Sequence, residues 1–300
     1  MKTENKVMNF KGLKDKLFFI FVTLISLFVI VFLVGIIYSI FKNGYEIFRS
    51  VGIIKFVFGF NWFPTYEPQE FGIFPLIIGS LAVTLMSIII CIPFGLGSAI
   101  YISEIAKPKE KEFLKPFLEI LASIPSVIYG LFGMVFLAPL VRRVFNIDSG
   151  FNLLTASIIL GFMVVPVVAS FTEDALNAVP LSLREASYAL GANKWETIWK
   201  VVVPSSISGI TSAIVLGFGR AIGETMVVLM VAGNSSKIPR SLLDSVRPMS
   251  STIAAEMGET AFGTLHFHAL FGIAIVLFVI TFVLNIITEF VRHRFIIKRY

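Results

Sequence analysis

Six long apolar segments, separated by shorter polar stretches, form the dominant pattern of this chain. They occupy about residues 17–41, 73–103, 117–140, 151–171, 205–232 and 267–291. The hydrocarbon core of a bilayer is ~30 Å thick, and about 20 apolar residues in a helix are enough to cross it. The pattern therefore predicts an all-α integral membrane protein with six transmembrane helices.

The composition supports a single membrane domain. Of the 300 residues, 56% are hydrophobic and 31 are phenylalanine, which is more apolar material than a soluble core of this size needs. No internal repeat of solenoid period and no low-complexity linker divides the chain. Cys91 is the only cysteine and lies within an apolar segment, so we expect a small buried side chain and no disulfide framework.

The basic residues indicate how the chain is oriented in the membrane. If the N-terminus is cytoplasmic, the inner segments 1–16, 104–116, 172–204 and 292–300 hold 16 Lys and Arg residues, and the outer segments hold 8. This bias predicts that both termini are cytoplasmic, flanking a membrane domain over 17–291 with its core at about 73–291. The net charge of +6 comes from residues at span ends, which is typical of membrane proteins and gives no indication of nucleic-acid binding.

Proline and glycine interrupt several spans. They are Pro93, Gly95, Gly97, Pro125, Gly130, Gly133, Gly161 and Pro166. Small residues allow helices to pack closely in membranes, which is one interpretation of each position. The alternative is a bent helix that lines a path, because irregular backbone is tolerated where it faces protein or water.

The polar loop 172–204 predicts two short helices joined by a glycine. Ser182 and Glu185 have the spacing of a capping box, and Gly191 is placed to end that first helix. A second helix is expected from Asn193 towards Pro204, where the chain bends before the fifth span. Ala186, Ala189 and Ala192 are small enough for a partner to approach closely, and Trp195 and Trp199 lie four residues apart on one face. From local chemistry alone, Glu185 is either a helix cap or a contact residue.

Two opposite charges fall in the middle of the fifth span. Arg220 and Glu224 are four residues apart, so a continuous helix would place them on one face. One hypothesis is an ion pair that hides both charges from lipid. The other is that both residues, with Thr225, line a substrate pathway, because the planar guanidinium suits phosphate oxygens. Glu224 could then accept a hydrogen bond from a protonated oxyanion.

Other candidate motifs carry little weight. Gly217, Gly219 and Gly223 have the wrong spacing for a dinucleotide fingerprint, and the chain has no phosphate-binding G-x-x-x-x-G-K-[ST] loop. If ATP drives this protein, another chain binds it. His266 and His268 form only two potential ligands, so we expect no metal role for them.

The spaced pattern Glu185, Ala186, Ser187, Gly191, Ala192 and Pro204 resembles the cytoplasmic signature loop of ABC importer permeases. Further motifs that carry a resemblance are Trp62-Phe63-Pro64, the segments 71–80 and 123–130, and Gly219-Arg220-Ala221-Ile222-Gly223-Glu224-Thr225-Met226. From about residue 60 onward the chain is similar to the permease subunits of the bacterial phosphate ABC importer. Gly-Glu-Thr-Met and the Trp-x-Pro loop resemble the first, C-type permease of that family.

This resemblance implies the architecture of a type I ABC importer in the bacterial inner membrane. The expected partners are a second homologous permease, two cytoplasmic ATPase subunits that bind ATP and Mg, and an external phosphate-binding protein. In that family the signature loop seats in a cleft of the ATPase. We expect the external segments 42–72 and 233–266, including Trp62, Tyr66 and Arg240, to dock the binding protein; the alternative is that these segments pack against the second permease.

Two other functions remain open from the sequence. The substrate of such a permease could be another oxyanion, such as molybdate or sulfate. A membrane-embedded enzyme could use Arg220 and Glu224 as catalytic groups, although the sequence has no histidine cluster, nucleophile motif or paired acidic site to accompany them.

Overall fold

The computed structural model describes the backbone of residues 2–297 and the side chains of residues 15, 16 and 18–287. The outermost residues of the two predicted terminal segments, 1 and 298–300, lie outside the described residues. In the described part, five helices are long and apolar enough to cross a membrane, and a bent helix pair raises this number to six. The five are Phe18–Val51, Phe74–Ile105, Ser126–Phe145, Leu153–Asn177 and Leu265–Ile287, and the pair is Lys194–Ser205 with Ile207–Ile222.

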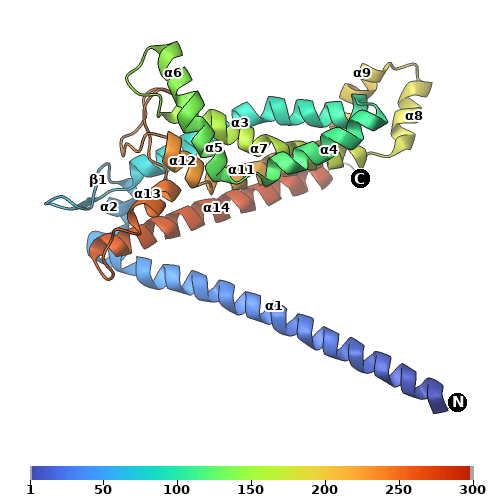
Figure 1. The fold of residues 1–300 in the computed structure, drawn as a ribbon, viewed down its shortest axis with the longest axis horizontal. Helices are drawn as coiled ribbons and strands as arrows, with labels where there is room; N and C mark the ends of the chain where they lie inside the picture. The colour runs from blue at the N-terminus through green and yellow to red at the C-terminus, as the bar shows by residue number, and fades with distance from the viewer. Residues whose placement is uncertain (1, 298–300) are drawn as a thin grey trace.

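Two long helices, α3 (Phe74–Ile100) and α7 (Leu153–Asn177), form the centre of the molecule. They pack along their length, and α11 (Ile207–Ile222) lies against both (Figure 1). Glycine makes these contacts possible: a Cβ on Gly161 of α7 would lie 2.9 Å from the Ser87 carbonyl oxygen of α3. Pro93 and Pro166 lie inside α3 and α7 without ending them. Close packing is therefore the correct interpretation for Gly161.

The third apolar segment begins later than the sequence predicted. Residues 108–123 form a separate helix, α4 (Pro108–Ser123), which follows the short π-helix η1 (Tyr101–Ile105). Pro125 then starts a new helix in a different direction, because the residue before a proline is disfavoured in the α region. The third span consists of α5 (Ser126–Phe132), η2 (Gly133–Leu137) and α6 (Ala138–Phe145). The predicted range 117–140 is thus wrong at both ends.

The polar loop and the fifth span are built from short helices. The loop contains α8 (Leu181–Ala189), α9 (Lys194–Thr197), η3 (Ile198–Val202) and α10 (Val203–Ser205). The helix axis turns by 68° between the stretch Lys194–Ser205 and α11. α11 ends at Ile222, and a further helix, α12 (Met226–Val231), continues the segment. The loop helices lie at the end of the molecule opposite the β-strands (Figure 1).

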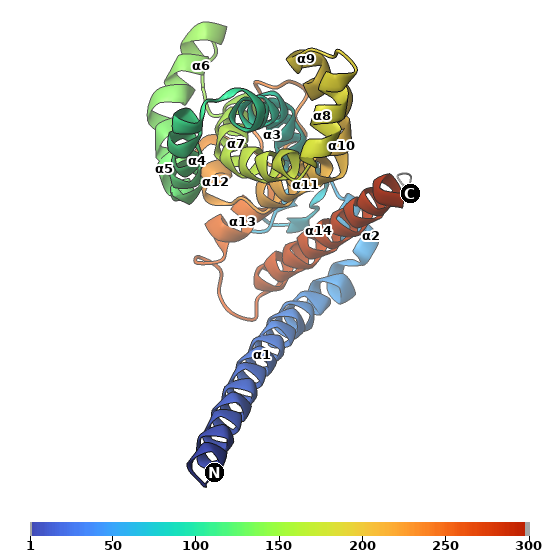
Figure 2. The same cartoon turned by 90° about the vertical axis from the view of Figure 1, so that its right-hand side faces the viewer.

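The first helix, α1 (Lys2–Val51), leaves the body of the molecule at an angle (Figure 2). It meets the last helix, α14 (Leu265–Ile297), near one end only. There the two backbones approach closely, since a Cβ on Gly44 would lie 3.0 Å from the Phe271 carbonyl oxygen. His268 Nδ1 also lies 2.8 Å from the Asn43 carbonyl oxygen. The apolar side chains from Phe18 to Val34 are exposed in this single chain.

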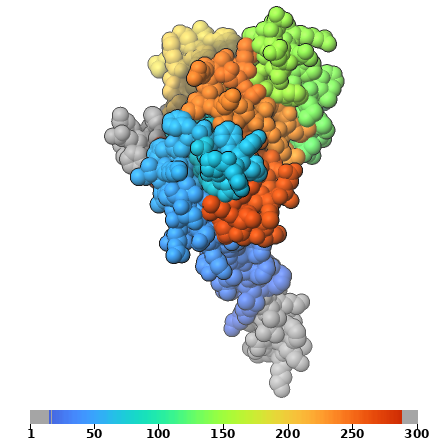
Figure 3. Space-filling view, turned by 90° about the vertical axis from the view of Figure 1, so that its left-hand side faces the viewer, coloured from blue at the N-terminus to red at the C-terminus, as the bar shows by residue number. Residues whose placement is uncertain are grey.

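A compact group of small elements closes the end of the molecule where α1 and α14 meet. It contains α2 (Ile53–Phe58), the antiparallel strands β1 (Trp62–Phe63) and β2 (Glu70–Phe71), and α13 (Met249–Glu256). Figure 3 looks onto this end, where the blue segments near residue 60 lie beside the orange and red segments. A second apolar cluster, separate from that around α3 and α7, fills this end; it includes Ile47, Phe56, Trp62, Leu76, Met249 and Leu270.

Candidate functional site

The break in the fifth span lies beside both candidate pathway charges. The last turn of α11 holds Arg220, and Gly223 follows its final residue as the C-cap. Glu224 comes after the break, and its Oε1 accepts hydrogen bonds from the backbone N–H groups of Met226 (3.0 Å) and Val227 (3.2 Å). This carboxylate therefore caps the N-terminus of α12, where free N–H groups and the helix dipole favour negative charge.

Arg220 and Glu224 do not form the ion pair that was one of the two hypotheses. No described acidic side chain lies within 4.0 Å of the Arg220 guanidinium. The prediction that the two residues share a face of one helix is wrong, because the helix ends at Ile222. A spacing of four residues places two side chains on one face only where the helix is continuous, and a glycine can let the chain leave the helix between them.

The Arg220 side chain is exposed in the single chain and lies within electrostatic reach of Tyr129 on α5. Tyr129 donates a hydrogen bond from its hydroxyl to the Leu121 carbonyl oxygen at 3.0 Å. Thr225 is partly exposed, and its hydroxyl donates to the Gly223 carbonyl oxygen at 3.3 Å. The three predicted pathway residues are thus brought together at the break, with Arg220 making no described hydrogen bond.

The polar loop has two helices, as predicted, but the first begins differently. α8 starts at Leu181 after Pro180, which is its N-cap, and no side chain caps it. The predicted capping box of Ser182 and Glu185 is wrong, because Pro180 takes the N-cap position and the helix begins at Leu181, two residues earlier than a Ser182 cap would allow. Glu185 is exposed and makes no hydrogen bond or ion pair with any described residue. Its interpretation as a cap residue is therefore excluded.

The joint between the two loop helices follows the sequence prediction closely. Gly191 has φ +83°, a left-handed conformation that glycine adopts without strain. The Gly191 N–H donates to the Tyr188 carbonyl and the Ala192 N–H to the Ser187 carbonyl, which is a Schellman ending. Asn193 Oδ1 accepts from the Glu196 N–H at 2.9 Å, and Glu196 Oε2 accepts from the Asn193 N–H at 3.0 Å. This reciprocal pair is the capping box of α9.

The loop presents most of its predicted contact residues on the surface. Glu185, Ala186, Gly191 and Pro204 are exposed, and Ala192 is partly exposed. Ser187 differs, because its side chain is buried and its hydroxyl lies 2.9 Å from that of Thr197. Ser187 therefore joins α8 to the second helix from inside, and the indoles of Trp195 and Trp199 remain exposed.

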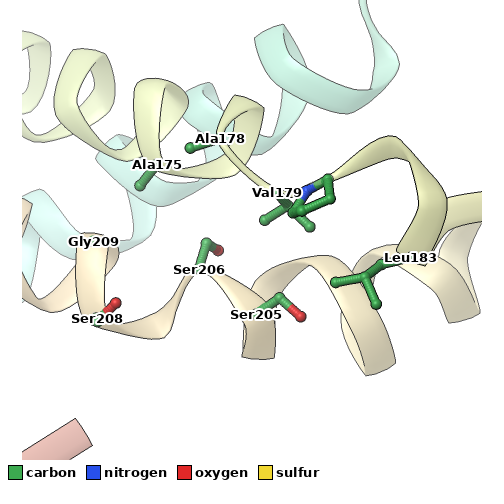
Figure 4. Close-up of a pocket in the computed structure, with 9 residues that line it drawn as sticks. Ala175, Ala178, Val179, Leu183, Ser205, Ser206, Ser208 and Gly209 are labelled. Atoms are coloured by element: carbon green, nitrogen blue, oxygen red, sulfur yellow. The ribbon is translucent and has the colours of Figure 1, made fainter. Parts of the chain in front are cut away.

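A cavity of about 430 Å³ lies where the loop meets α11. Ala175, Ala178 and Val179 line it from the end of α7, and Leu183 lines it from α8. Figure 4 shows the opposite wall, where Ser205, Ser206, Ser208 and Gly209 follow one another around the bend into α11.

Two ion pairs near the polar loop were not predicted from the sequence. Arg184 of α8 contacts Glu104 of η1, and Lys115 of α4 contacts Glu173 of α7 at 2.7 Å. Hydrogen bonds from Lys115 to Glu173 and then Asp174 raise the pKa of the lysine. The sequence places these charges at the ends of apolar segments, but it gives no sign of which residues meet across 58 to 80 positions.

At the opposite end of the molecule, Glu256 joins three separate segments. Its carboxylate accepts hydrogen bonds from Trp62 Nε1 (3.2 Å) and Arg247 (2.6 Å), and it lies 2.8 Å from His266 Nε2. Trp62 is 2% exposed, so its predicted role as a docking side chain is wrong. His266 and His268 point to different partners, since His268 contacts the Asn43 carbonyl.

An open cavity of about 720 Å³ lies beside this group. Phe60, Asn61 and Phe63 line one side, and Lys237 and Arg240 contribute cationic groups on the other. Asp244 also lines this cavity, and its Oδ2 accepts the backbone N–H of Arg240 at 2.7 Å, whereas neither cationic side chain forms an ion pair among the described residues. Tyr66 is nearby in sequence and 67% exposed.

Comparisons with known proteins show which family the chain is similar to. Residues 91–297 match the family described as "Binding-protein-dependent transport system inner membrane component". The chain is 38% identical to the Bacillus subtilis protein "Probable ABC transporter permease protein YqgH", over 82% of this chain and 80% of that protein. It is 33% identical to the phosphate transport system permease protein PstC of Mesorhizobium japonicum, over 94% of this chain and 91% of PstC.

The fold is also similar to that of a solved transporter. A chain in an inward-facing structure of the MetNI methionine ABC transporter superposes with a TM-score of 0.58 at 19% identity. The match covers 72% of this chain and 93% of that chain. At this identity the likeness concerns the fold alone.

Proposed function

We propose a function for this chain from one premise: it belongs to the family of binding-protein-dependent transport system inner membrane components. It is a multi-pass permease subunit of an ABC transporter, with the fold of the type I importer permeases. The alternative of a membrane-embedded enzyme is not retained, because the family is a transport component. We infer that the cargo of this subunit is inorganic phosphate, imported with energy from ATP hydrolysed in partner subunits.

The unpaired Arg220 carries this proposal. An arginine in the middle of a span is costly unless it faces a partner or water, and Arg220 has no described acidic partner. It lies one turn before the break in the fifth span, where irregular backbone requires protein or water around it. A bidentate phosphate is the ligand that best fits a guanidinium in that position.

Glu224 supplies a means of selecting among oxyanions. Its Oε1 is engaged by the N-terminus of α12, whereas Oε2 has no hydrogen-bond partner among the described residues. We infer that Oε2 accepts a hydrogen bond from a protonated phosphate oxygen. Sulfate and molybdate are fully deprotonated near neutral pH and offer no such donor, which makes them the weaker candidates.

The exposed surface of the polar loop is the proposed contact with the ATPase. Glu185 and Ala186 on α8, with Gly191 and Ala192 at the joint, form one accessible patch. The Schellman ending and the capping box of α9 hold the two helices in a defined angle. A rigid, small-residue surface of this kind suits insertion into a cleft, and the excess of Lys and Arg on the same side supports a cytoplasmic location for it and for both termini.

The cationic cavity with Lys237 and Arg240 is the proposed docking place for the external phosphate-binding protein. This proposal keeps Arg240, which lines the cavity, and the exposed Tyr66 from the sequence prediction, and it leaves out the buried Trp62. We expect acidic side chains on the binding protein to meet this cavity. The full assembly in this proposal contains a second homologous permease and two ATPase subunits.

Phosphate uptake tests the proposal directly. The complex should be reconstituted in proteoliposomes with ATP inside and the binding protein with labelled phosphate outside. Arg220→Gln keeps most of the side-chain length but removes the charge, so we expect uptake to fall at least 100-fold with the complex intact. Excess sulfate or molybdate should not compete with phosphate in the unchanged complex.

Arg143→Gln provides a matched control. Arg143 is an exposed arginine at the end of α6 that has no described acidic partner, and its loss should not alter uptake. Normal uptake by Arg220→Gln, or equal loss in both variants, would contradict the role assigned to Arg220. Efficient competition by sulfate or molybdate would instead reassign the substrate.

A further inference from the structure

A chain of polar contacts leads from the polar loop into three other helices. Arg184 on α8 is its first member, and its NH1 contacts Glu104 Oε1 at 2.6 Å and also Oε2. Its NH2 donates to the Leu176 carbonyl oxygen at 2.8 Å. One guanidinium thus binds the end of α3, through η1, and the end of α7. Because the guanidinium is planar and rigid, a tilt of α8 changes both contacts together.

The contacts continue from Glu104 across to α4. The Ser103 hydroxyl lies 3.1 Å from Glu104 Oε1 and 3.0 Å from Asn177 Oδ1. Asn177 Nδ2 donates to Glu173, and Glu173 Oε2 accepts from Lys115 at 2.7 Å. Lys111 Nζ of α4 also lies 3.2 Å from Asn177 Oδ1 and 3.5 Å from Glu173 Oε1. We call this set the α8–α4 network; its members are Arg184, Glu104, Ser103, Asn177, Glu173, Lys111 and Lys115.

Burial makes the two carboxylates of the network dependent on their partners. The Glu104 side chain is 8% exposed and the Glu173 side chain 2% exposed, whereas Arg184 is 15% exposed. A buried charge that loses its partner is strongly destabilised. Movement of α8 away from Glu104 is therefore resisted until the ends of α3 and α7 move with it.

We propose that the α8–α4 network makes Arg184 a positioning residue that transmits movement of the ATPase-docking loop to α3, α7 and α4. The inference rests on the proposed function, because it takes the exposed face of α8 as the ATPase contact. Arg184 is partly buried, and Ser187, on the same side of α8, is buried, whereas Glu185 and Ala186 are exposed. The network therefore acts behind the docking surface and does not form it.

The test measures coupling separately from docking. The full complex with both permeases and the ATPase should be purified and reconstituted with the binding protein and phosphate. The readouts are co-elution of the ATPase, basal ATP hydrolysis, hydrolysis stimulated by the loaded binding protein, and ATP consumed per phosphate transported. Arg184→Gln should retain co-elution and basal hydrolysis, while stimulation falls at least tenfold and ATP consumed per phosphate rises.

Variants of the partner residue identify the contact. Glu104→Gln should reproduce the loss, and the double variant Arg184→Gln with Glu104→Gln should be no worse than either single one, because both remove one interaction. Arg184→Lys keeps the charge but lacks the fork that reaches both Glu104 and Leu176, so it should recover only part of the coupling. Lys109→Gln, an exposed cation on α4 without a described partner, is the matched control and should behave as the unchanged complex.

Ser103→Ala keeps the test decisive if the charge variants fail to assemble. It removes one small hydroxyl between Glu104 and Asn177 and should lower stimulation about threefold with assembly intact. Normal stimulation in Arg184→Gln, or in Ser103→Ala where the charge variants do not assemble, would overturn the proposal. Multiplying losses in the double variant, or loss of ATPase co-elution from Arg184→Gln, would overturn it too. Failure of the unchanged and Lys109→Gln complexes to transport phosphate would contradict the proposed function instead.

Discussion

Trp62 and Glu256 are 194 positions apart in the chain, and the indole N–H of one donates to the carboxylate of the other at 3.2 Å. The same carboxylate receives Arg247 and contacts His266. Four segments at the end of the molecule where α1 and α14 meet are therefore joined at a single carboxylate. Its removal should loosen all of them together.

Glu256→Gln should destabilise this end more than Trp62→Phe. The glutamine leaves the partly buried Arg247 without its counter-charge, which costs about 1–3 kcal/mol. Trp62→Phe loses a neutral donor and some packing, worth about 1 kcal/mol from the hydrogen bond alone. Thermal unfolding of the detergent-solubilised complex would measure both, and an equal or smaller shift for Glu256→Gln would show that the network is not electrostatic in origin.

Gly191→Val should weaken coupling without hindering membrane insertion. A Cβ at this position meets nothing within 4 Å, so the cost comes from the φ of +83° alone, at about 1–2 kcal/mol. The strain should change the angle between α8 and α9 and reduce phosphate-stimulated ATP hydrolysis. Gly97→Ala, where the added Cβ also meets nothing and φ is ordinary, is the control. Unchanged stimulation in Gly191→Val would count against the loop as the ATPase contact.

The two roles of Glu224 can be separated by substitution. Glu224→Gln retains an oxygen that accepts from the Met226 and Val227 N–H groups, so α12 should stay capped, whereas Glu224→Ala should cost about 1 kcal/mol. The exchange of Arg220 and Glu224 places a cation at the cap, where the helix dipole opposes it. We expect the exchanged protein to assemble and not transport, and phosphate uptake at the normal rate would refute the assigned role of Arg220.

The second loop helix should depend on pH only under acidic conditions. The backbone N–H of Asn193 and then the Lys200 ammonium lower the pKa of Glu196. A lowered pKa stabilises the folded loop above the unfolded value of about 4.3, and this contribution is lost as pH falls through the lower folded value. The protection factor of the Asn193 amide, which corrects for the intrinsic pH dependence of exchange, should fall only below that range in the intact protein, and Glu196→Gln should reduce this fall. A protection factor that already falls near pH 6 would contradict this assignment.

Much of the architecture could be predicted from the sequence because the membrane restricts the choices. The apolar lengths predicted where the spans lie, except the third, whose two ends were wrong. The glycine and asparagine of the loop predicted its joint through local chemistry that needs no distant partner. The boundary between α4 and α5 was not predicted, because Pro125 changes the direction of the chain although the residues around it are continuously apolar. The break after Ile222 was missed for a related reason: three glycines near Arg220 permit it but do not require it.

The candidate site was predicted in part for the same physical reasons. Arg220 stands out in any apolar segment because a charge there is expensive. Arg184 and Glu104 do not stand out, since both occur where charges are ordinary at the ends of spans. Their importance follows only from their contact, which joins two residues 80 positions apart and depends on tertiary packing.

The close approach of α1 and α14 at Gly44 also fixes an order of events in biosynthesis. The first membrane helix has its main packing partner in the last, and the Gly44 surface meets Phe271 and Ile275. This contact cannot form until more than 220 further residues have been synthesised and inserted. It is therefore among the most non-local contacts in the fold, and its formation costs the entropy of closing that whole loop. During translation the earlier helices must therefore pack without the contact between α1 and α14. The contact at Gly44 can therefore form only after the first part of α14 has been synthesised and inserted.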